Sequence, residues 1–205
     1  ADEVITGIGR TGKNFAIEHW GVVPDIITTA KALSSGYAPL AAVILHDRVY
    51  GAIAQGSGQM TQGFTYSGHP LSASVGLAVL KYLTAHQLVA QAGRIGAVLL
   101  RRLEELKRFP IVGDARGTGL ILGLEFVADQ ASKRPFPPEL GVTRRIVEAT
   151  LAEGVMVVPG MSGMIDGRAG DHIQISPPYI FSEEHVERLV RALSVAIEKV
   201  MREVR

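Results

Sequence analysis

The run of six apolar residues from Leu40 to Leu45 is the feature that most constrains the fold of this chain. Its sequence, Leu-Ala-Ala-Val-Ile-Leu, contains no polar residue, which is typical of a strand that is buried on both faces. Residues 26–30 form a second apolar stretch that is rich in β-branched side chains and also predicts a strand. Strands of this kind need layers on both sides, so we expect an α/β architecture in this part of the chain.

The remaining pattern predicts a second, smaller region. Apolar positions between residues 69 and 86 predict a largely buried helix, and residues 88–107 predict a helix with a charged, solvated face. We expect further strands at residues 1–6, 111–116, 119–127, 155–158 and 172–176, and further helices at residues 47–54, residues 142–153 and from Ser182 to the C-terminus. The organisation is then part of an α/β layer in residues 1–85, followed by a linking helix and a small α+β domain in residues 86–205.

Composition excludes several classes of function. The net charge of +1 gives no electrostatic case for binding nucleic acid or an acidic membrane surface. The sequence contains no cysteine, which removes disulfides and thiolate nucleophiles and favours a cytoplasmic location. No apolar stretch is long enough to span a bilayer, and the histidines lack the spacing of metal ligands, so we expect neither a membrane span nor a metal site.

Lys31 is the first candidate for chemistry. The apolar run of residues 26–30 ends on this lone amine, and Ser-Ser-Gly-Tyr follows at residues 34–37. A second candidate is Asp2, an acid within the short apolar stretch of residues 1–6. An amine and a carboxylate at the ends of two strands are the groups that a pyridoxal phosphate site requires. From spacing alone, a surface lysine and a buried structural acid remain equally good interpretations.

The glycines at positions 7, 9 and 12 match the spacing of a dinucleotide-binding loop. That loop requires a helix directly after the third glycine and an acid at the end of the next strand. Here Lys13-Asn14-Phe15 is a weak helix start, and Asp25 precedes its strand. The pattern therefore favours a glycine-rich turn over a dinucleotide site.

Several longer motifs follow one another along the chain. They are Ala1-Asp2-Glu3-Val4-Ile5-Thr6-Gly7-Ile8-Gly9-Arg10-Thr11-Gly12, Pro24-Asp25-Ile26 leading to Lys31, Ser35-Gly36-Tyr37-Ala38-Pro39-Leu40, Gly63-Phe64-Thr65-Tyr66-Ser67-Gly68-His69-Pro70, Arg116-Gly117-Thr118-Gly119-Leu120 and Ser176-Pro177-Pro178-Tyr179-Ile180. Taken together, and in this order, they resemble the class III (ω-type) aminotransferases, which have the fold of type I pyridoxal phosphate enzymes.

The resemblance implies a role for four residues. Lys31 binds the aldehyde of pyridoxal 5'-phosphate and acts as the catalytic base, and Asp2 pairs with the pyridine nitrogen. Val4 packs against the face of the ring, and Thr65 contacts the phosphate bound to the neighbouring subunit. By this likeness the enzyme is a homodimer with sites at its interface, and residues 1–85 are the C-terminal part of the large, cofactor-binding domain.

The implied reaction transfers an amino group from an amine or amino acid to a keto acid. Relatives in the family also include aminomutases and decarboxylases, which these residues do not separate. Relatives that act on ornithine or 4-aminobutyrate carry an arginine shortly before the paired prolines, where this chain has Gln174. Arg168, in the preceding loop, is a candidate substitute for gripping a substrate carboxylate.

The resemblance concerns the C-terminal half of the family. The chain opens without Met in a stretch that predicts a strand, so we expect that residues belonging before Ala1 are missing. In the family, the N-terminal half supplies the cup for the cofactor phosphate. We therefore expect the 205-residue chain to bind the cofactor weakly and to be inactive by itself. The alternative is a non-catalytic subunit that needs a partner carrying the other half.

Overall fold

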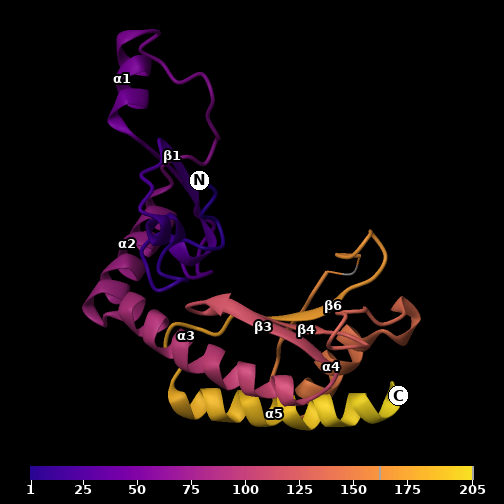
Figure 1. The fold of residues 1–205 in the computed structure, drawn as a ribbon. Helices are drawn as coiled ribbons and strands as arrows, with labels where there is room; N and C mark the ends of the chain where they lie inside the picture. The colour runs from indigo at the N-terminus through magenta and orange to yellow at the C-terminus, as the bar shows by residue number, and fades with distance from the viewer. Residues whose placement is uncertain (162, 205) are drawn as a thin grey trace. The chain divides into compact units, whose positions relative to one another are not determined.

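A computed structural model describes residues 1–161 and 163–204 of the chain. The chain divides into two compact units, Ala1–Gln91 and Ala92–Arg205. Both units combine helices with a β-sheet (Figure 1), in agreement with the expected α/β class. Within the described residues, no helix is long and apolar enough to cross a membrane.

The first unit contains a two-stranded antiparallel sheet in which Thr28 lies opposite Val43. Its elements are the 3-10 helix η1 (Ala16–Trp20), strand β1 (Ile26–Thr29), the 3-10 helix η2 (Lys31–Leu33), strand β2 (Ala42–Leu45), and helices α1 (Asp47–Gln55) and α2 (Pro70–Ala85). The apolar patterns therefore predicted β1, β2 and α2 in the right places. Helix α1 is capped by His46, whose Nδ1 accepts a hydrogen bond from the Arg48 N–H.

Three expectations about the first unit were wrong. Residues 1–6 do not form a strand: only Asp2 makes a β-bridge, to Thr28, and the chain then turns because the Gly7 N–H donates to the Glu3 carbonyl. Strand β2 is not buried on both faces, since Val43 is 57% exposed in a sheet of only two strands. Helix α2 is not largely buried either, because only Gly76 and Leu83 are enclosed.

The second unit is built around a four-stranded antiparallel sheet in the order β3-β4-β6-β5. Its elements are α3 (Leu88–Glu104, which begins in the first unit), the 3-10 helix η3 (Glu105–Arg108), β3 (Val112–Thr118), β4 (Ile121–Phe126), the 3-10 helix η4 (Pro138–Leu140), α4 (Val142–Ala152), β5 (Val158–Pro159), β6 (Asp171–Ile175) and α5 (Glu183–Glu203). The expected strand at residues 155–158 is displaced to Val158–Pro159. The last helix begins where it was expected, and Ser182 is its N-cap, since its hydroxyl accepts from the His185 N–H.

The hydrophobic core of the chain lies in the second unit. Alternate residues of β4, Leu122, Leu124 and Phe126, point inward, as period-two patterning requires. They belong to the same apolar cluster as Leu99 of α3 and Leu193 of α5, both fully enclosed. A continuous core of this kind makes the second unit the better packed part of the chain.

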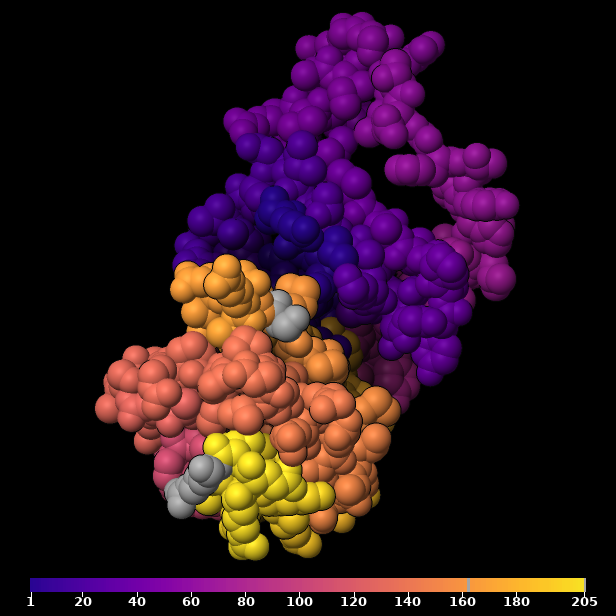
Figure 2. All heavy atoms as spheres, turned by 90° about the vertical axis from the view of Figure 1, so that its right-hand side faces the viewer, coloured from indigo at the N-terminus to yellow at the C-terminus, as the bar shows by residue number. Residues whose placement is uncertain are grey.

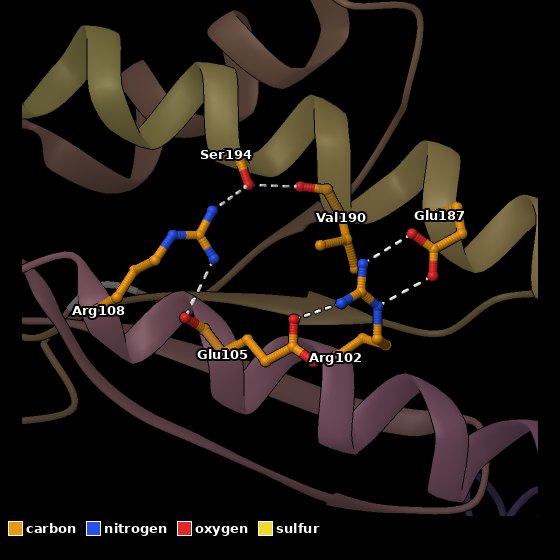
Figure 3. Close-up of polar contacts among 6 residues, drawn as sticks. All are labelled: Arg102, Glu105, Arg108, Glu187, Val190 and Ser194. Carbon is orange, nitrogen blue, oxygen red and sulfur yellow. Dashed lines mark hydrogen bonds and ion pairs between the residues drawn. The ribbon is translucent and has the colours of Figure 1, made fainter.

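Polar contacts join α3 and η3 to α5 along their exposed edge (Figure 3). The Arg102 guanidinium forms a two-pronged pair with Glu187, through Nε to Oε1 at 2.9 Å and Nη2 to Oε2 at 2.7 Å, and it also contacts Glu105. Nearby, Arg108 donates to the Ser194 hydroxyl at 3.2 Å. The carboxylate hydrogen bonds of Glu187 and Glu105 raise the pKa of Arg102, so this side chain stays charged. These contacts add polar links between helices that already share the apolar core.

Candidate functional site

Asp2 lies beside β1, the strand that precedes Lys31. The Glu3 N–H donates to the Thr28 carbonyl at 2.8 Å, and the Thr28 N–H donates to the Ala1 carbonyl at 3.0 Å. These bonds hold Asp2 parallel to Thr28 of β1. The carboxylate of Asp2 is exposed, and its Oδ1 accepts from the Val4 N–H at 3.0 Å. The second carboxylate oxygen is available for another donor.

Lys31 follows β1 after one residue, Ala30, and opens η2. Its φ of 40° is in the left-handed region, where a residue with a side chain is strained. The surrounding turn holds this conformation: the Ser34 N–H donates to the Lys31 carbonyl at 3.3 Å, and the Ser34 hydroxyl donates to the Ala38 carbonyl at 2.5 Å. Strain of about 1–3 kcal/mol persists where the surroundings impose it, and such positions cluster at functional sites.

The structure places Asp2 and Lys31 near the same strand, β1. Asp2 is paired with Thr28, and only three positions separate Thr28 from Lys31. Three residues span at most about 10 Å and paired strands lie about 5 Å apart, so the backbones of Asp2 and Lys31 are within about 15 Å of each other. Val4, half-buried, is on the same short segment as Asp2.

Thr65 lies apart from these residues in the sequence, between α1 and α2. It is exposed, as is the whole stretch of residues 54–71. In the space-filling view this stretch stands clear of the rest of the first unit and borders an open gap (Figure 2). Among the described residues, no hydrogen bond or ion pair joins Thr65 to Asp2 or Lys31.

Arg168 belongs to the second unit, in a tight turn that its backbone N–H closes by donating to the Ile165 carbonyl at 3.0 Å. Its side chain is exposed. Gln174 lies on β6, and its amide donates to the Ser176 hydroxyl at 2.7 Å. Gln174 and Ser176 line a cavity of about 410 Å³ within the second unit, together with Arg188 and the prolines that follow β6.

Glu3 is the functional candidate that the sequence analysis missed. It is 3% exposed, and both of its carboxylate oxygens are hydrogen-bonded, to Thr6 and to the backbone of Ile17. The signal available in the sequence was an acid between two residues already singled out, Asp2 and Val4. Across the described residues, no group of three or more acidic, histidine or cysteine side chains is placed to hold a metal ion.

Comparison with known proteins identifies the relatives of this chain. The family model described as aminotransferase class-III matches residues 1–197. An aminotransferase of Bacillus subtilis, YodT, is 45% identical over 201 residues, which are 98% of this chain and 45% of that protein. The diaminobutyrate–2-oxoglutarate transaminase of Halomonas elongata is 39% identical, and the matched residues are 98% of this chain and 42% of that protein.

Solved structures agree with these relatives. A transaminase from the marine bacterium Virgibacillus superposes with a TM-score of 0.93 at 39% identity, over 100% of this chain and 46% of that one. A thermostable (S)-enantioselective ω-transaminase from Thermomicrobium roseum gives a TM-score of 0.88 at 39% identity, over 98% of this chain and 43% of that one. These likenesses confirm the expected fold class. The chain spans less than half the length of the relatives it matches.

Proposed function

Because this chain belongs to the class III aminotransferases, we propose that it is the portion of a pyridoxal phosphate-dependent aminotransferase that carries the catalytic lysine, Lys31. The observation that carries the proposal is local. Lys31 is held in a left-handed conformation at the end of β1, and an exposed carboxylate, Asp2, is paired to the same strand. An amine and an acid in this relation match the two ends of a pyridoxal ring.

The residues present fit the cofactor by their chemistry. Lys31 supplies a primary amine for the cofactor aldehyde, and Asp2 has a carboxylate oxygen free to accept a hydrogen bond from the protonated ring nitrogen. When bound, pyridoxal phosphate supplies a ring that draws electrons from the carbon next to the substrate nitrogen. Lys31 then holds and moves a proton at its Nζ atom, while Asp2 keeps the ring nitrogen protonated. Val4 is proposed to pack against the ring.

The domain division and the assembly belong to the same proposal. Residues 1–85 are taken as part of the cofactor-binding domain, and residues 86–205 as a linking helix and small domain. Thr65 is proposed to contact the phosphate of a neighbouring subunit in a homodimer. The exposure of Thr65 and of the flanking Phe64 and Tyr66, 76% and 82% exposed, supports a contact outside its own unit. The cytoplasmic location stays a prediction.

The proposed substrates are an amine or amino acid donor and a keto acid acceptor. Gln174 is neutral and hydrogen-bonded to Ser176, so it cannot form a two-pronged ion pair with a second substrate carboxylate. Arg168 is exposed and is the candidate for that contact. Relatives at similar identity act, by their names, on diaminobutyrate and gamma-aminobutyrate.

We also propose that the 205 residues alone bind the cofactor weakly. The described residues contain the amine and the carboxylate of the site, and the relatives are more than twice as long. The exposure of Val43 on β2 and of Leu71 and Leu77 on α2 supports the expectation that further chain covers this unit.

A trapping experiment tests the role of Lys31. The chain is incubated with pyridoxal phosphate, reduced with borohydride, and digested for mass spectrometry. We expect the cofactor on Lys31 in preference to other lysines, loss of that label in Lys31→Ala, and retention in Lys13→Ala, a matched control because Lys13 is exposed in the same unit. Labelling spread evenly over the surface lysines would contradict the assignment. With the remaining family length restored, alanine formation from pyruvate and an amine donor separates transfer from mutase or decarboxylase chemistry.

A further inference from the structure

Glu3 is a buried carboxylate that the proposed chemistry leaves unused. Its side chain is 3% exposed, in a unit where most polar side chains reach solvent. Burying a carboxylate is costly unless its oxygens are hydrogen-bonded. The hydrogen-bond partners of Glu3 therefore show which parts of the structure the buried carboxylate holds together.

The partners of Glu3 come from three separate places in the sequence. Its Oε2 accepts from the Thr6 hydroxyl at 2.5 Å, and its Oε1 accepts from the Ile17 N–H in η1 at 2.8 Å. Its backbone N–H donates to the Thr28 carbonyl of β1 at 2.8 Å, and its carbonyl accepts from the Gly7 N–H at 3.0 Å. Glu3 thus connects the N-terminal turn, η1 and β1.

The approach of Gly7 shows how closely the chain folds around this residue. A Cβ atom at Gly7 would lie 2.7 Å from the Glu3 carbonyl oxygen and 3.1 Å from the Glu3 Cβ. Any side chain at position 7 would displace Glu3. The turn therefore depends on a glycine at position 7 and a buried acceptor at position 3.

The burial of successive residues then relates Glu3 to the site. Asp2 is exposed, Glu3 is buried and Val4 is half-buried, so Glu3 is the inner side chain of this short stretch and Asp2 is an outer one. The Asp2 side chain itself has one hydrogen bond, to the Val4 N–H. The direction of the Asp2 carboxylate is therefore set by the backbone of residues 2–4, which Glu3 anchors from the inner side.

We propose that Glu3 is a positioning residue: it orients the Asp2 carboxylate toward the ring nitrogen of a cofactor held on Lys31. This inference rests on the proposed function, because it assigns Glu3 a task only if Asp2 contacts that nitrogen. Glu3 itself touches neither substrate nor cofactor.

The experiment compares two aldehydes on the chain with the remaining family length restored, because the 205 residues alone are proposed to bind the cofactor weakly. One is pyridoxal phosphate, and the other is its analogue with a ring C–H in place of the pyridine nitrogen. Both react with the amine of Lys31, but only the first can be held by Asp2. Borohydride trapping and peptide mass spectrometry give the ratio of the two products at Lys31. A charge-assisted hydrogen bond to Asp2 should favour pyridoxal phosphate by about tenfold in the native chain.

The variants separate orientation from folding. Asp2→Asn is the reference and should remove the preference. Glu3→Ala should remove it too, while trapping of the analogue stays unchanged. Glu3→Gln should restore it, because the amide oxygen can accept from the Ile17 N–H and the amide nitrogen can donate to the Thr6 hydroxyl. Thr6→Val removes only the Thr6 hydroxyl as a partner of Glu3 and should lower the preference for pyridoxal phosphate by about threefold. If circular dichroism shows that Glu3→Ala is unfolded, the Thr6→Val result decides whether Glu3 orients Asp2.

The outcomes distinguish the inference from its premise. If the native chain shows no preference, or if Asp2→Asn keeps it, the proposed role of Asp2 fails and the inference fails with it. If Asp2→Asn loses the preference but a folded Glu3→Ala keeps it, only the inference is overturned. The inference is equally overturned if Glu3→Ala or Thr6→Val lowers the trapping of both aldehydes alike, since that result is a general loss of structure.

Discussion

Gly96 of α3 is a position where one methyl group should produce two opposing effects on stability. An added Cβ would lie 2.1 Å from the carbonyl oxygen of Gly119 and 2.5 Å from its Cα. Optimal contacts between such atoms are about 3.5–4 Å, so the helix or the turn between β3 and β4 must move by about 1 Å. All the atoms approached belong to the backbone, which cannot give way by rotating a side chain.

The magnitude follows from the two terms. Alanine is favoured over glycine inside a helix by about 1 kcal/mol. Overpacking a tightly fitted interface costs about 1–3 kcal/mol, and the upper end applies here because Gly119 is followed by the fully buried Leu120. For Gly96→Ala we therefore expect a net destabilisation of the second unit by about 2 kcal/mol, or roughly 10 °C in its unfolding temperature.

The assay must report on each unit separately. Native-state hydrogen exchange, read by mass spectrometry on peptides from β4 and α5, measures the free energy of opening of the second unit. The matched control is Gly51→Ala in α1, where an added Cβ meets no atom within 4 Å. There the helix propensity acts alone, so peptides from α1 should gain up to about 1 kcal/mol of protection. A Gly96→Ala variant as stable as the native chain would refute the close approach of α3 to Gly119.

Two further predictions concern the second unit. Leu193 of α5 is fully enclosed, so Leu193→Ala should lower the free energy of unfolding by about 3 kcal/mol. Val195 is on the same helix and 45% exposed, so Val195→Ala should lower it by well under half as much. Chemical denaturation monitored by circular dichroism compares the two variants, and equal effects would contradict the assigned core. The hydrogen bond from Arg116 lowers the pKa of Asp114 below its usual 3.8, so this group stabilises the folded state above that pH and the contribution is lost as the pH falls through the lower, folded value. Asp114→Asn should therefore weaken the acid-induced loss of stability between about pH 5 and pH 2, as measured by exchange at β3, and an unchanged slope would count against the pairing with Arg116.

The sequence predicted the elements of the second unit well. The expected strand at residues 119–127 and the expected helix from Ser182 correspond to β4 and α5, whose buried residues include Leu124 and Leu193. Each of these elements packs against neighbours within its own unit, so local pattern and final burial agree. The serine cap at Ser182 was predictable for the same reason, because it depends on only four successive residues.

Burial in the first unit could not be read from its sequence. The apolar run of residues 40–45 gives a strand, but the two-stranded sheet leaves Val43 and Ile44 exposed. Patterning records which surfaces are suited to burial, whereas actual burial depends on what covers them. The predicted strand at residues 1–6 failed for a different reason: the hydrogen bonds of Glu3 with Thr6, Gly7 and Ile17 close a turn, and no periodicity signals such contacts.

The position of Lys31 supports chemistry more strongly than its sequence neighbourhood does. At a φ of 40° a glycine would be free of strain, and nothing in the stability of the turn calls for a lysine there. Lys133 is also in the left-handed region, at a φ of 59°, so the conformation counts only together with its place in the fold. At Lys31 the chain holds an amine in a conformation that its surroundings maintain, at the end of the strand to which Asp2 is paired. Such an arrangement is understandable if the direction of the amine matters more than the local free energy, and this is the requirement that covalent catalysis by a lysine imposes.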